Sequence, residues 1–316
     1  MSVNMKNLSE SDVKKALPNV DLKAALKSAL MGLSDGTSKQ PNKTIVELQN
    51  DKGDCMFFTG VVESLGCFGV KASPYLVDKS AKGENPVTAY TMLVSSETGL
   101  PTVMCDATYL TVARTAETTG LAVDLLLNAS SAKKVAVIGS GQAALAHLEV
   151  QLRDRTWEEV SVFSPSLAAS EQKVEAFKRL GHNALEIASS AEDAVSNADL
   201  VMLCTSANSP VVNSAALKVG CLVTSISTDA KDAHEIDPKS LQQMDVYCDY
   251  RETVALKAGE MSIAKAEIDW SYDSIVADLP ELLSQSTTVE TEKTRFWRST
   301  GLAIEDIAAA FAIAEA

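Results

Sequence analysis

The sequence predicts an α/β protein with two domains, one built on a doubly wound parallel sheet and the other mainly antiparallel. Between Thr44 and Val103, short β-branched and aromatic runs are separated by turn residues, which is typical of an antiparallel sheet. From Lys134 onward, strand-like and helix-like segments alternate, which indicates parallel βαβ units. With 316 residues, 46% of them hydrophobic, the chain is long enough to bury more than one core.

The first third of the chain contains a helical lead-in, the antiparallel sheet and a long helix. Residues 1–32 carry apolar side chains at helical spacing around a break at Pro18. The strands expected next are TIVEL, CMFFTGVV, CFGVKASPYLV and TAYTMLV. The long helix is expected in DATYLTVARTAETTGLAVDLLLN, with Asp106 or Thr108 as its cap.

The rest of the chain predicts the parallel sheet and a final helix. The expected strands are KVAVIG, EVSVFS, ADLVMLCTS, CLVTSIS and DVYCDY, and helices are expected around AALAHLEVQL, EQKVEAFKRL and AEDAVSN. The last segment, TEKTRFWRSTGLAIEDIAAAFAIAEA, is expected to form a turn and then a helix that packs on the first domain. The predicted domains are residues 1–118, completed by 300–316, and residues 119–299.

Charge argues against two classes of partner. The chain has 28 basic and 42 acidic residues, a net charge of -14, so it would be repelled by a nucleic-acid backbone or an anionic membrane. The first residues lack the apolar core of a signal peptide, and the apolar stretch near the end is interrupted by Glu305 and Asp306. We therefore expect a cytoplasmic protein without nucleic-acid or membrane partners.

The cysteines and histidines suggest no metal and no covalent catalysis. The 6 cysteines are scattered without a C-x-x-C pair, and the 3 histidines do not accompany them at zinc-binding spacing. Reduced thiols are the simplest interpretation. A Ser-His or Cys-His nucleophile has few histidines to use.

A glycine-rich turn follows the first strand of the parallel domain. In VAVIGSGQAALAHL, the residues Gly139, Gly141 and Ala144 form the pattern G-x-G-x-x-A between a strand and a helix. The first glycine permits a tight turn, the second admits a pyrophosphate, and the small third residue allows close packing of the helix. In this context the pattern predicts a Rossmann domain that binds a dinucleotide.

The type of nicotinamide cofactor is left open by the second strand. An acidic residue usually ends this strand where NAD binds, whereas a basic residue nearby accepts the 2'-phosphate of NADP. Here Ser164, Pro165 and Ser166 occupy those positions. Because none of these three residues is acidic, a 2'-phosphate would not be repelled there. The three residues do not decide between NAD and NADP.

Four charged residues have no obvious structural reason for their positions. Lys71 lies in the apolar run FGVKASPYL, Arg114 in an apolar part of the long helix, and Lys43 at the start of KTIVEL. Together these cations suggest a pocket for a small carboxylate, although each alone is also explained by a solvated face or an ion pair. Asp229 follows the strand CLVTSIST at the edge where doubly wound folds bind ligands, and a turn or helix cap is its structural alternative.

The chain resembles the ornithine cyclodeaminase/mu-crystallin family over nearly its whole length. The resemblance rests on FGVKASPY, SSETGLPTVMCDATYLTVARTA, VAVIGSGQAALAHLE, LCTSANSPVV, TDAKDAHEID, DYRETVALKAGEM and FWRSTGLAIEDIAAA, in family order. It implies a substrate-binding and dimerisation domain, a Rossmann domain that carries NAD(H) or NADP(H), and a homodimer.

The resemblance also assigns roles to individual residues. It implies that Lys71 and Arg114 bind the substrate carboxylate with Lys43, where many members have arginine, and that Asp229 is the catalytic acid, with Lys71 beside it in catalysis. The residues expected to contact the cofactor are Thr115, Gly139, Ser140, Gly141, Gln142, Ala143, Ser164, Pro165, Ser166, Thr205, Ser206, Ser227, Ser299, Thr300 and Gly301.

One position bears on the substrate. The resemblance implies that cyclodeaminases have a glutamate, which holds a distal amino group, where this chain has Met56, although Glu117 is a possible substitute. Burying a cation without a partner is costly, which favours a substrate without a distal ammonium. The leading hypothesis is NAD(P)H-dependent reduction of 1-pyrroline-2-carboxylate or 1-piperideine-2-carboxylate to L-proline or L-pipecolate. The alternatives are an ornithine cyclodeaminase and a non-catalytic binder of NADPH and a small ligand.

Overall fold

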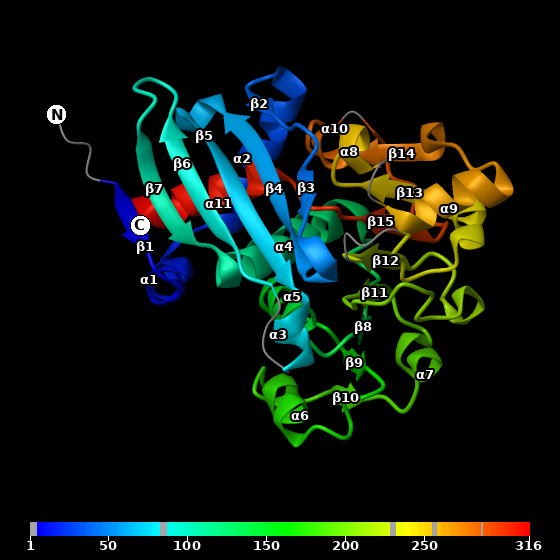
Figure 1. Cartoon of the computed structure of the whole chain (residues 1–316). Coiled ribbons are helices and arrows are strands. Elements are labelled where there is room, and N and C mark those ends of the chain that lie inside the picture. The colour runs from blue at the N-terminus through cyan, green and yellow to red at the C-terminus, as the bar shows by residue number, and fades with distance from the viewer. Residues whose placement is uncertain (1–4, 83–86, 228–231, 255–257, 286) are drawn as a thin grey trace. The chain divides into compact units, whose positions relative to one another are not determined.

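A computed structural model describes residues 5–82, 87–227, 232–254, 258–285 and 287–316 (Figure 1). The chain divides into two compact units, Met1–Thr118 with Gly301–Ala316, and Thr119–Thr300. The first unit contains a mixed sheet and the second a parallel sheet, which confirms the predicted α/β fold class. No described helix combines the length and the apolar character needed to cross a membrane.

The first unit is built on a mainly antiparallel sheet. Its strand order is β1-β7-β6-β5-β4-β2, and β3 also pairs with β4. The strands are β1 (Lys6–Leu8), β2 (Ser38–Lys39), β3 (Thr44–Glu47), β4 (Gly53–Val62), β5 (Cys67–Leu76), β6 (Tyr90–Ser95) and β7 (Pro101–Asp106). The helices are α1 (Glu10–Ala16), η1 (Leu17–Asn19), α2 (Leu22–Asp35), η2 (Gln49–Asp51), η3 (Glu63–Leu65), α3 (Val77–Ala81) and α11 (Ala303–Glu315), and α4 (Thr108–Leu126) begins here.

One part of the lead-in was predicted wrongly. Residues Lys6–Leu8 form β1, which pairs with β7 in parallel, whereas the sequence predicted only helix there. Three residues are too few to show a strand period, and their neighbours are helical. α4 begins at Thr108, and the carboxylate of Asp106, one of the two predicted caps, accepts a hydrogen bond from the backbone N–H of Thr108 at 3.1 Å.

The C-terminal helix α11 packs directly on the sheet, where it contacts β4 and β5 (Figure 1). Gly60 and Gly69 are cross-strand partners beneath it. A Cβ atom at Gly60 would lie 3.2 Å from Ile307 Cδ1, and one at Gly69 would lie 3.1 Å from Ile307 Cγ1. The two glycines therefore allow the close approach that places Glu305 and Asp306 of this helix inside the unit.

The second unit is a doubly wound sheet whose strands are all parallel. Its order is β10-β9-β8-β11-β12-β15-β13-β14. The strands are β8 (Lys134–Ile138), β9 (Glu159–Phe163), β10 (Leu185–Ile187), β11 (Leu200–Leu203), β12 (Leu222–Ser225), β13 (Asp245–Cys248), β14 (Ile275–Asp278) and β15 (Arg295–Arg298). The helices are α5 (Gln142–Asp154), α6 (Glu171–Lys178), α7 (Ala191–Val195), η4 (Ser214–Ala216), η5 (Pro238–Gln243), α8 (Arg251–Val254), α9 (Gly259–Ile268), η6 (Tyr272–Ser274) and α10 (Leu279–Leu283).

The segment before α11 is a strand and not the predicted turn. RFWR forms β15, which lies between β12 and β13 in the sheet. The charged ends hid this strand, because Arg295 and Arg298 are 1% and 0% exposed, and each donates to backbone carbonyl oxygens inside the unit. Arg295 donates to the carbonyl oxygens of Leu126 and Gly220.

The cysteines are free thiols, as predicted. Burial raises the pKa of every one of them, to about 11 for Cys67 and Cys221 and to about 12 for Cys105. A thiol with a raised pKa is protonated at neutral pH and is a poor nucleophile. The cysteines therefore belong to the packing of the two units.

The turn from β8 to α5 has the backbone that the glycine pattern predicts. Gly139 has φ +137°, and a Cβ atom there would lie 2.3 Å from the carbonyl oxygen of Cys204. Gly141 has φ −85°, and a Cβ atom there would meet nothing within 4 Å. Gly139 is thus required by the fold, whereas the space above Gly141 is open.

The two glycines should respond differently to the same substitution. Gly139→Ala should lower the free energy of unfolding by about 3 kcal/mol, because it adds backbone strain and a steric overlap. Gly141→Ala, the matched control, should cost about 0.5 kcal/mol or less. Urea denaturation of both variants measures the difference, and equal losses would contradict the described turn.

Candidate active site

Most of the residues expected to bind a cofactor lie at one edge of the parallel sheet. They follow the carboxyl ends of five strands: Gly139–Ala143 after β8, Ser164–Ser166 after β9, Thr205 and Ser206 after β11, Ser227 after β12, and Ser299 and Thr300 after β15. The strand order reverses between β9-β8 and β8-β11, which is where doubly wound folds bind nucleotides.

The start of α5 fits the pyrophosphate of a dinucleotide. Gly141 is the N-cap, and no side chain caps the helix there. The first N–H groups of a helix point out of its N-terminus, and the helix dipole favours an anion there. Since Gly141 is exposed and has open space above it, a phosphate can reach these groups.

Glu235 joins two of the strand ends and was not predicted from the sequence. Its carboxylate accepts hydrogen bonds from the backbone N–H of Thr205 at 2.7 Å, the Thr205 hydroxyl at 2.8 Å and the Ser225 hydroxyl at 2.6 Å. Burial raises the pKa of Glu235, while these hydrogen bonds and Arg298 act in the opposite direction. Glu235 therefore fixes the loop after β11 against β12.

Arg298 holds together the ends of two neighbouring strands, β12 and β15. Its Nε atom lies 2.9 Å from Oε1 of Glu260, and both side chains are at most 1% exposed. Its Nη1 donates to the carbonyl oxygens of Ser227 at 3.2 Å and Ser299 at 2.6 Å. The Arg298–Glu260 pair thus holds the backbone at the ends of β12 and β15.

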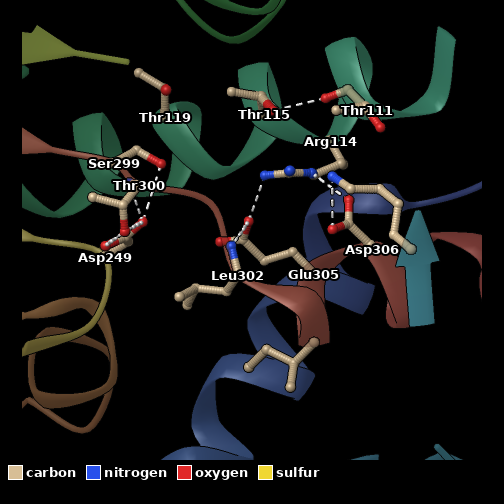
Figure 2. A network of polar contacts seen from close by, with 12 residues as sticks. Thr111, Arg114, Thr115, Thr119, Asp249, Ser299, Thr300, Leu302, Glu305 and Asp306 are labelled. Atoms are coloured by element: carbon tan, nitrogen blue, oxygen red, sulfur yellow. Dashed lines mark hydrogen bonds and ion pairs between the residues drawn. The ribbon is translucent and has the colours of Figure 1, made fainter. Parts of the chain in front are cut away.

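Asp249 also holds the segment after β15 (Figure 2). Its carboxylate accepts hydrogen bonds from the Ser299 hydroxyl at 3.3 Å, the Thr300 hydroxyl at 3.2 Å and the Thr300 backbone N–H. Asp249 is 0% exposed. Neither this residue nor the Arg298–Glu260 pair could be identified from the sequence, because their partners are distant in the chain.

The first unit brings together the three cations singled out in the sequence, and two of them are in ion pairs. Lys71 Nζ lies 2.9 Å from Asp306 Oδ2. Arg114 contacts Glu305 Oε2 through Nη1 at 2.7 Å and Asp306 Oδ1 through Nε at 2.8 Å (Figure 2). All four side chains are at most 5% exposed. We call these four residues the buried ion cluster.

Lys71 is the least hydrated of the cations. Burial lowers the pKa of its ammonium to about 8, because the loss of water outweighs the attraction of Asp306, and Arg114 and Lys43 lower it further. The ammonium also lies 4.2 Å from the centroid of the Phe58 ring. Of its three N–H groups, the described residues engage one with a carboxylate.

Lys43 lies beside the buried ion cluster but is half-buried. Its ammonium is 4.9 Å from the centroid of the same Phe58 ring. Because it lowers the pKa of Lys71, it adds positive charge on that side of the cluster. The three predicted cations therefore do converge, although internal carboxylates engage two of them.

Two residues expected to contact the cofactor lie in the first unit. The Thr115 hydroxyl donates to the carbonyl oxygen of Thr111 at 2.7 Å (Figure 2). Gly301 has φ +75°, and a Cβ atom there would lie 3.3 Å from Nη2 of Arg114. A larger residue at 301 would press on the guanidinium.

The structure describes two of the three remaining residues that the sequence analysis singled out. Asp229, the expected catalytic acid, lies outside the described residues. Met56 is on β4, opposite Ser73 and Ile45. Glu117 is 7% exposed on α4, three residues after Arg114.

His147 is placed for structure and not for proton transfer. Its Nδ1 lies 2.7 Å from the carbonyl oxygen of Ala143, and its Nε2 lies 2.9 Å from the Thr119 hydroxyl. Burial lowers its pKa to about 4. The neutral ring therefore donates from Nδ1 and accepts from Thr119 at neutral pH.

Relatives of known activity match almost the full chain. NAD(P)H-dependent anabolic L-arginine dehydrogenase DauB of Pseudomonas aeruginosa is 42% identical over 306 residues, which cover 96% of this chain and 95% of that protein. Ketimine reductase mu-crystallin of Mus musculus is 26% identical, with 92% of this chain and 88% of that protein covered.

A solved structure has the same fold. The Δ1-pyrroline-2-carboxylate reductase of Thermococcus litoralis, in complex with NADH and L-proline, superposes with a TM-score of 0.92 at 25% identity. The match covers 98% of this chain and 97% of that one. The family model described as the ornithine cyclodeaminase/mu-crystallin family matches residues 3–316. The resemblance is thereby confirmed, and the chain belongs to the ornithine cyclodeaminase/mu-crystallin family.

Proposed function

We propose that this protein is an NAD(P)H-dependent oxidoreductase that reduces the C=N bond of a small α-imino acid to give an L-amino acid. The observation that carries the proposal is Lys71, a buried ammonium with one carboxylate partner among the described residues. The names of its relatives, which include an amino-acid dehydrogenase and imine reductases, support the same class of reaction.

The parallel sheet of the second unit is proposed to bind the cofactor. Gly139–Ala143 would hold the pyrophosphate at the start of α5. When bound, the reduced nicotinamide supplies the hydride that adds to the imine carbon. Glu235, Asp249 and the Arg298–Glu260 pair keep the surrounding loops in place before binding.

The cations of the first unit are proposed to hold the substrate carboxylate. Lys71 has N–H groups beyond the one that faces Asp306, and Lys43 adds charge on the same side of Phe58. Arg114 is held by Glu305 and Asp306, which fixes the direction of its guanidinium. Fixing the carboxylate orients the imine carbon, and orientation accounts for a large part of the rate of such reactions.

Reduction of an imine also needs a proton for the nitrogen. We assign this role to Asp229, which comes four residues after Ser225, the last residue of β12. The reaction is then balanced: the carbon gains a hydride, the nitrogen gains a proton, and NAD(P)H becomes NAD(P)+. An aspartic acid can give this proton or stabilise the iminium ion.

A cyclic imino acid is the first candidate substrate. Met56 offers no charge to a distal ammonium, so a ring without one, as in 1-pyrroline-2-carboxylate or 1-piperideine-2-carboxylate, avoids a desolvation penalty. The products would be L-proline or L-pipecolate.

L-Arginine is a second candidate, favoured by the 42% identity to an L-arginine dehydrogenase. In that case ammonia condenses with 2-ketoarginine, water leaves, and the resulting imino acid is reduced. The guanidinium would need an anionic partner, and Glu117 is the buried carboxylate three residues from Arg114.

A substrate panel tests the proposed function. With NADH and NADPH in turn, absorbance at about 340 nm should fall with pyrroline or piperideine carboxylate, or with 2-ketoarginine plus ammonia. Glu117→Gln should raise KM for the arginine pair about tenfold through loss of a charged partner and leave cyclic imines unchanged. Release of ammonia from ornithine without net cofactor change would indicate a cyclodeaminase. Cofactor binding without any turnover would indicate a binding protein.

The carboxylate role of Lys71 predicts a pH dependence. Its pKa is lowered to about 8, so the ammonium is charged below that pH and loses its proton above it. Inhibition by tetrahydrofuran-2-carboxylate, which has no titrating nitrogen, should weaken about tenfold per pH unit above about pH 8. Lys71→Met should weaken it about 30-fold at neutral pH and abolish the pH dependence.

Lys39→Met on β2, an exposed lysine of the same sheet, is the matched control and should behave as the native protein. Arg114 keeps its contacts with Glu305 and Asp306 in Lys71→Met, so that variant should fold, with a free energy of unfolding lowered by about 3–5 kcal/mol through loss of one buried ion pair. An unchanged inhibition constant in Lys71→Met would remove Lys71 from the carboxylate site.

A homodimer is proposed through the face of the first sheet opposite α11. Side chains of β4, β5 and β6 form an apolar hollow of about 350 Å³ on it, lined by Pro41, Thr59, Gly60, Val61, Phe68, Gly69, Val70, Met92 and Val94. Phe68 is 41% exposed and Tyr90 is 50% exposed. An exposed apolar face of this kind is typical of an interface between subunits.

Charge on this face should separate the subunits. Val70→Glu should shift the sedimentation mass from twice the chain mass to that of one chain, because an unpaired carboxylate would be buried. Val219→Glu places the same change on a valine that is 82% exposed in the second unit, and it should leave the dimer intact. A native protein that sediments as a monomer would contradict the proposal.

A further inference from the structure

A lysine reaches the glycine-rich turn from the helix that follows β9. Lys173 lies in the first turn of α6, where its backbone N–H is bound by the N-cap Ser170. Its Nζ lies 3.3 Å from Oγ of Ser140, in the turn after β8. The sequence did not predict this position, because Lys173 comes nine positions after Ser164.

The same hydroxyl links the turn to the end of β9. Ser140 Oγ lies 3.0 Å from Ser164 Oγ, and the backbone N–H of Gly139 donates to the carbonyl oxygen of Phe163 at 2.8 Å. Lys173, Ser140 and Ser164 thus form a chain of polar contacts that joins three elements. All three belong to the second unit.

This is the place where a Rossmann domain distinguishes its two cofactors. The adenosine ribose lies beside the end of the second strand, where a carboxylate accepts from the 2'- and 3'-hydroxyls of NAD. Here that strand is followed by Ser164, Pro165 and Ser166, which are small and neutral. A carboxylate at these positions would repel a 2'-phosphate, whereas these residues do not. A hydroxyl can donate to a phosphate oxygen, and an ammonium adds charge.

An acidic residue on the same helix does not cancel this charge. Glu171 begins α6, two positions before Lys173. Side chains two apart on a helix point in different directions. The contact with Ser140 directs the Lys173 ammonium toward the glycine-rich turn.

We propose that Lys173, with Ser140 and Ser164, binds the 2'-phosphate of NADPH and makes NADPH the preferred cofactor of this protein. The inference rests on the proposed dinucleotide site and adds the choice between its two ligands. An exposed ammonium at a phosphate is screened by salt, so the preference is moderate and falls as ionic strength rises.

Measurements of cofactor binding test the proposed preference for NADPH, and they need no substrate. Dissociation constants for NADPH and NADH, from titration calorimetry or nicotinamide fluorescence, should differ about tenfold in favour of NADPH at about 50 mM salt. Lys173→Ala should weaken NADPH binding about tenfold and change NADH binding by less than about twofold. The native preference should shrink at about 500 mM salt.

Two further variants make the result specific. Lys178→Ala removes an exposed lysine from the last turn of the same helix and should leave both constants unchanged. Ser164→Asp should reverse the preference toward NADH, since a carboxylate there accepts from the ribose hydroxyls and repels the phosphate.

The possible failures are distinguishable. A native protein that binds both cofactors equally, or NADH more tightly, would overturn the role of Lys173 and leave the proposed function standing. A Lys173→Ala variant with unchanged NADPH affinity would do the same. A protein that binds neither cofactor would overturn the proposed function itself.

Discussion

The buried ion cluster is the constraint on which the first unit depends. Two carboxylates on α11, one cation on α4 and one on β5 form this cluster, and removing any one leaves an unbalanced charge among buried side chains. A buried ion pair often contributes little net stability compared with apolar side chains, but breaking one costs about 3–5 kcal/mol. The cluster therefore specifies how α11 docks, because an apolar helix made of small residues could otherwise slide along the sheet.

The same cluster serves the proposed chemistry. Glu305 and Asp306 hold Arg114 by two contacts, and Asp306 also holds Lys71, so the cations are oriented before any ligand arrives. Burial lowers the pKa of Lys71, because water has been removed from an ammonium that has one carboxylate partner among the described residues. A substrate carboxylate would accept hydrogen bonds from this ammonium, which would contribute binding energy for a small ligand.

The sequence predicted the parts of this molecule that depend on local pattern. The Rossmann strands, the glycine-rich turn and the cap of α4 are set by residues close together in the chain. It missed what depends on distant partners. The strand β15 was hidden by its arginines, whose backbone acceptors, such as Leu126, are far away in the chain. Glu235 and Asp249 were missed because the loops that they hold are brought to them only by the fold. Glu305 and Asp306 did leave a signal, because two acidic residues in an apolar helix need buried partners.

Buried carboxylates close to a proposed anion site would repel the anion if they were unpaired. In the second unit they are paired with hydrogen-bond donors or with an arginine. Glu235, Asp249 and Glu260 are all fully buried near the strand ends that would hold a dinucleotide. Each is neutralised locally, Glu235 by three donors, Asp249 by the Ser299–Thr300 segment, and Glu260 by Arg298. A carboxylate that is held by hydrogen-bond donors or by a cation projects less field outward, so it can position a phosphate-binding loop with less repulsion of the phosphate. The acidity of the chain and an affinity for a polyanionic cofactor are therefore compatible.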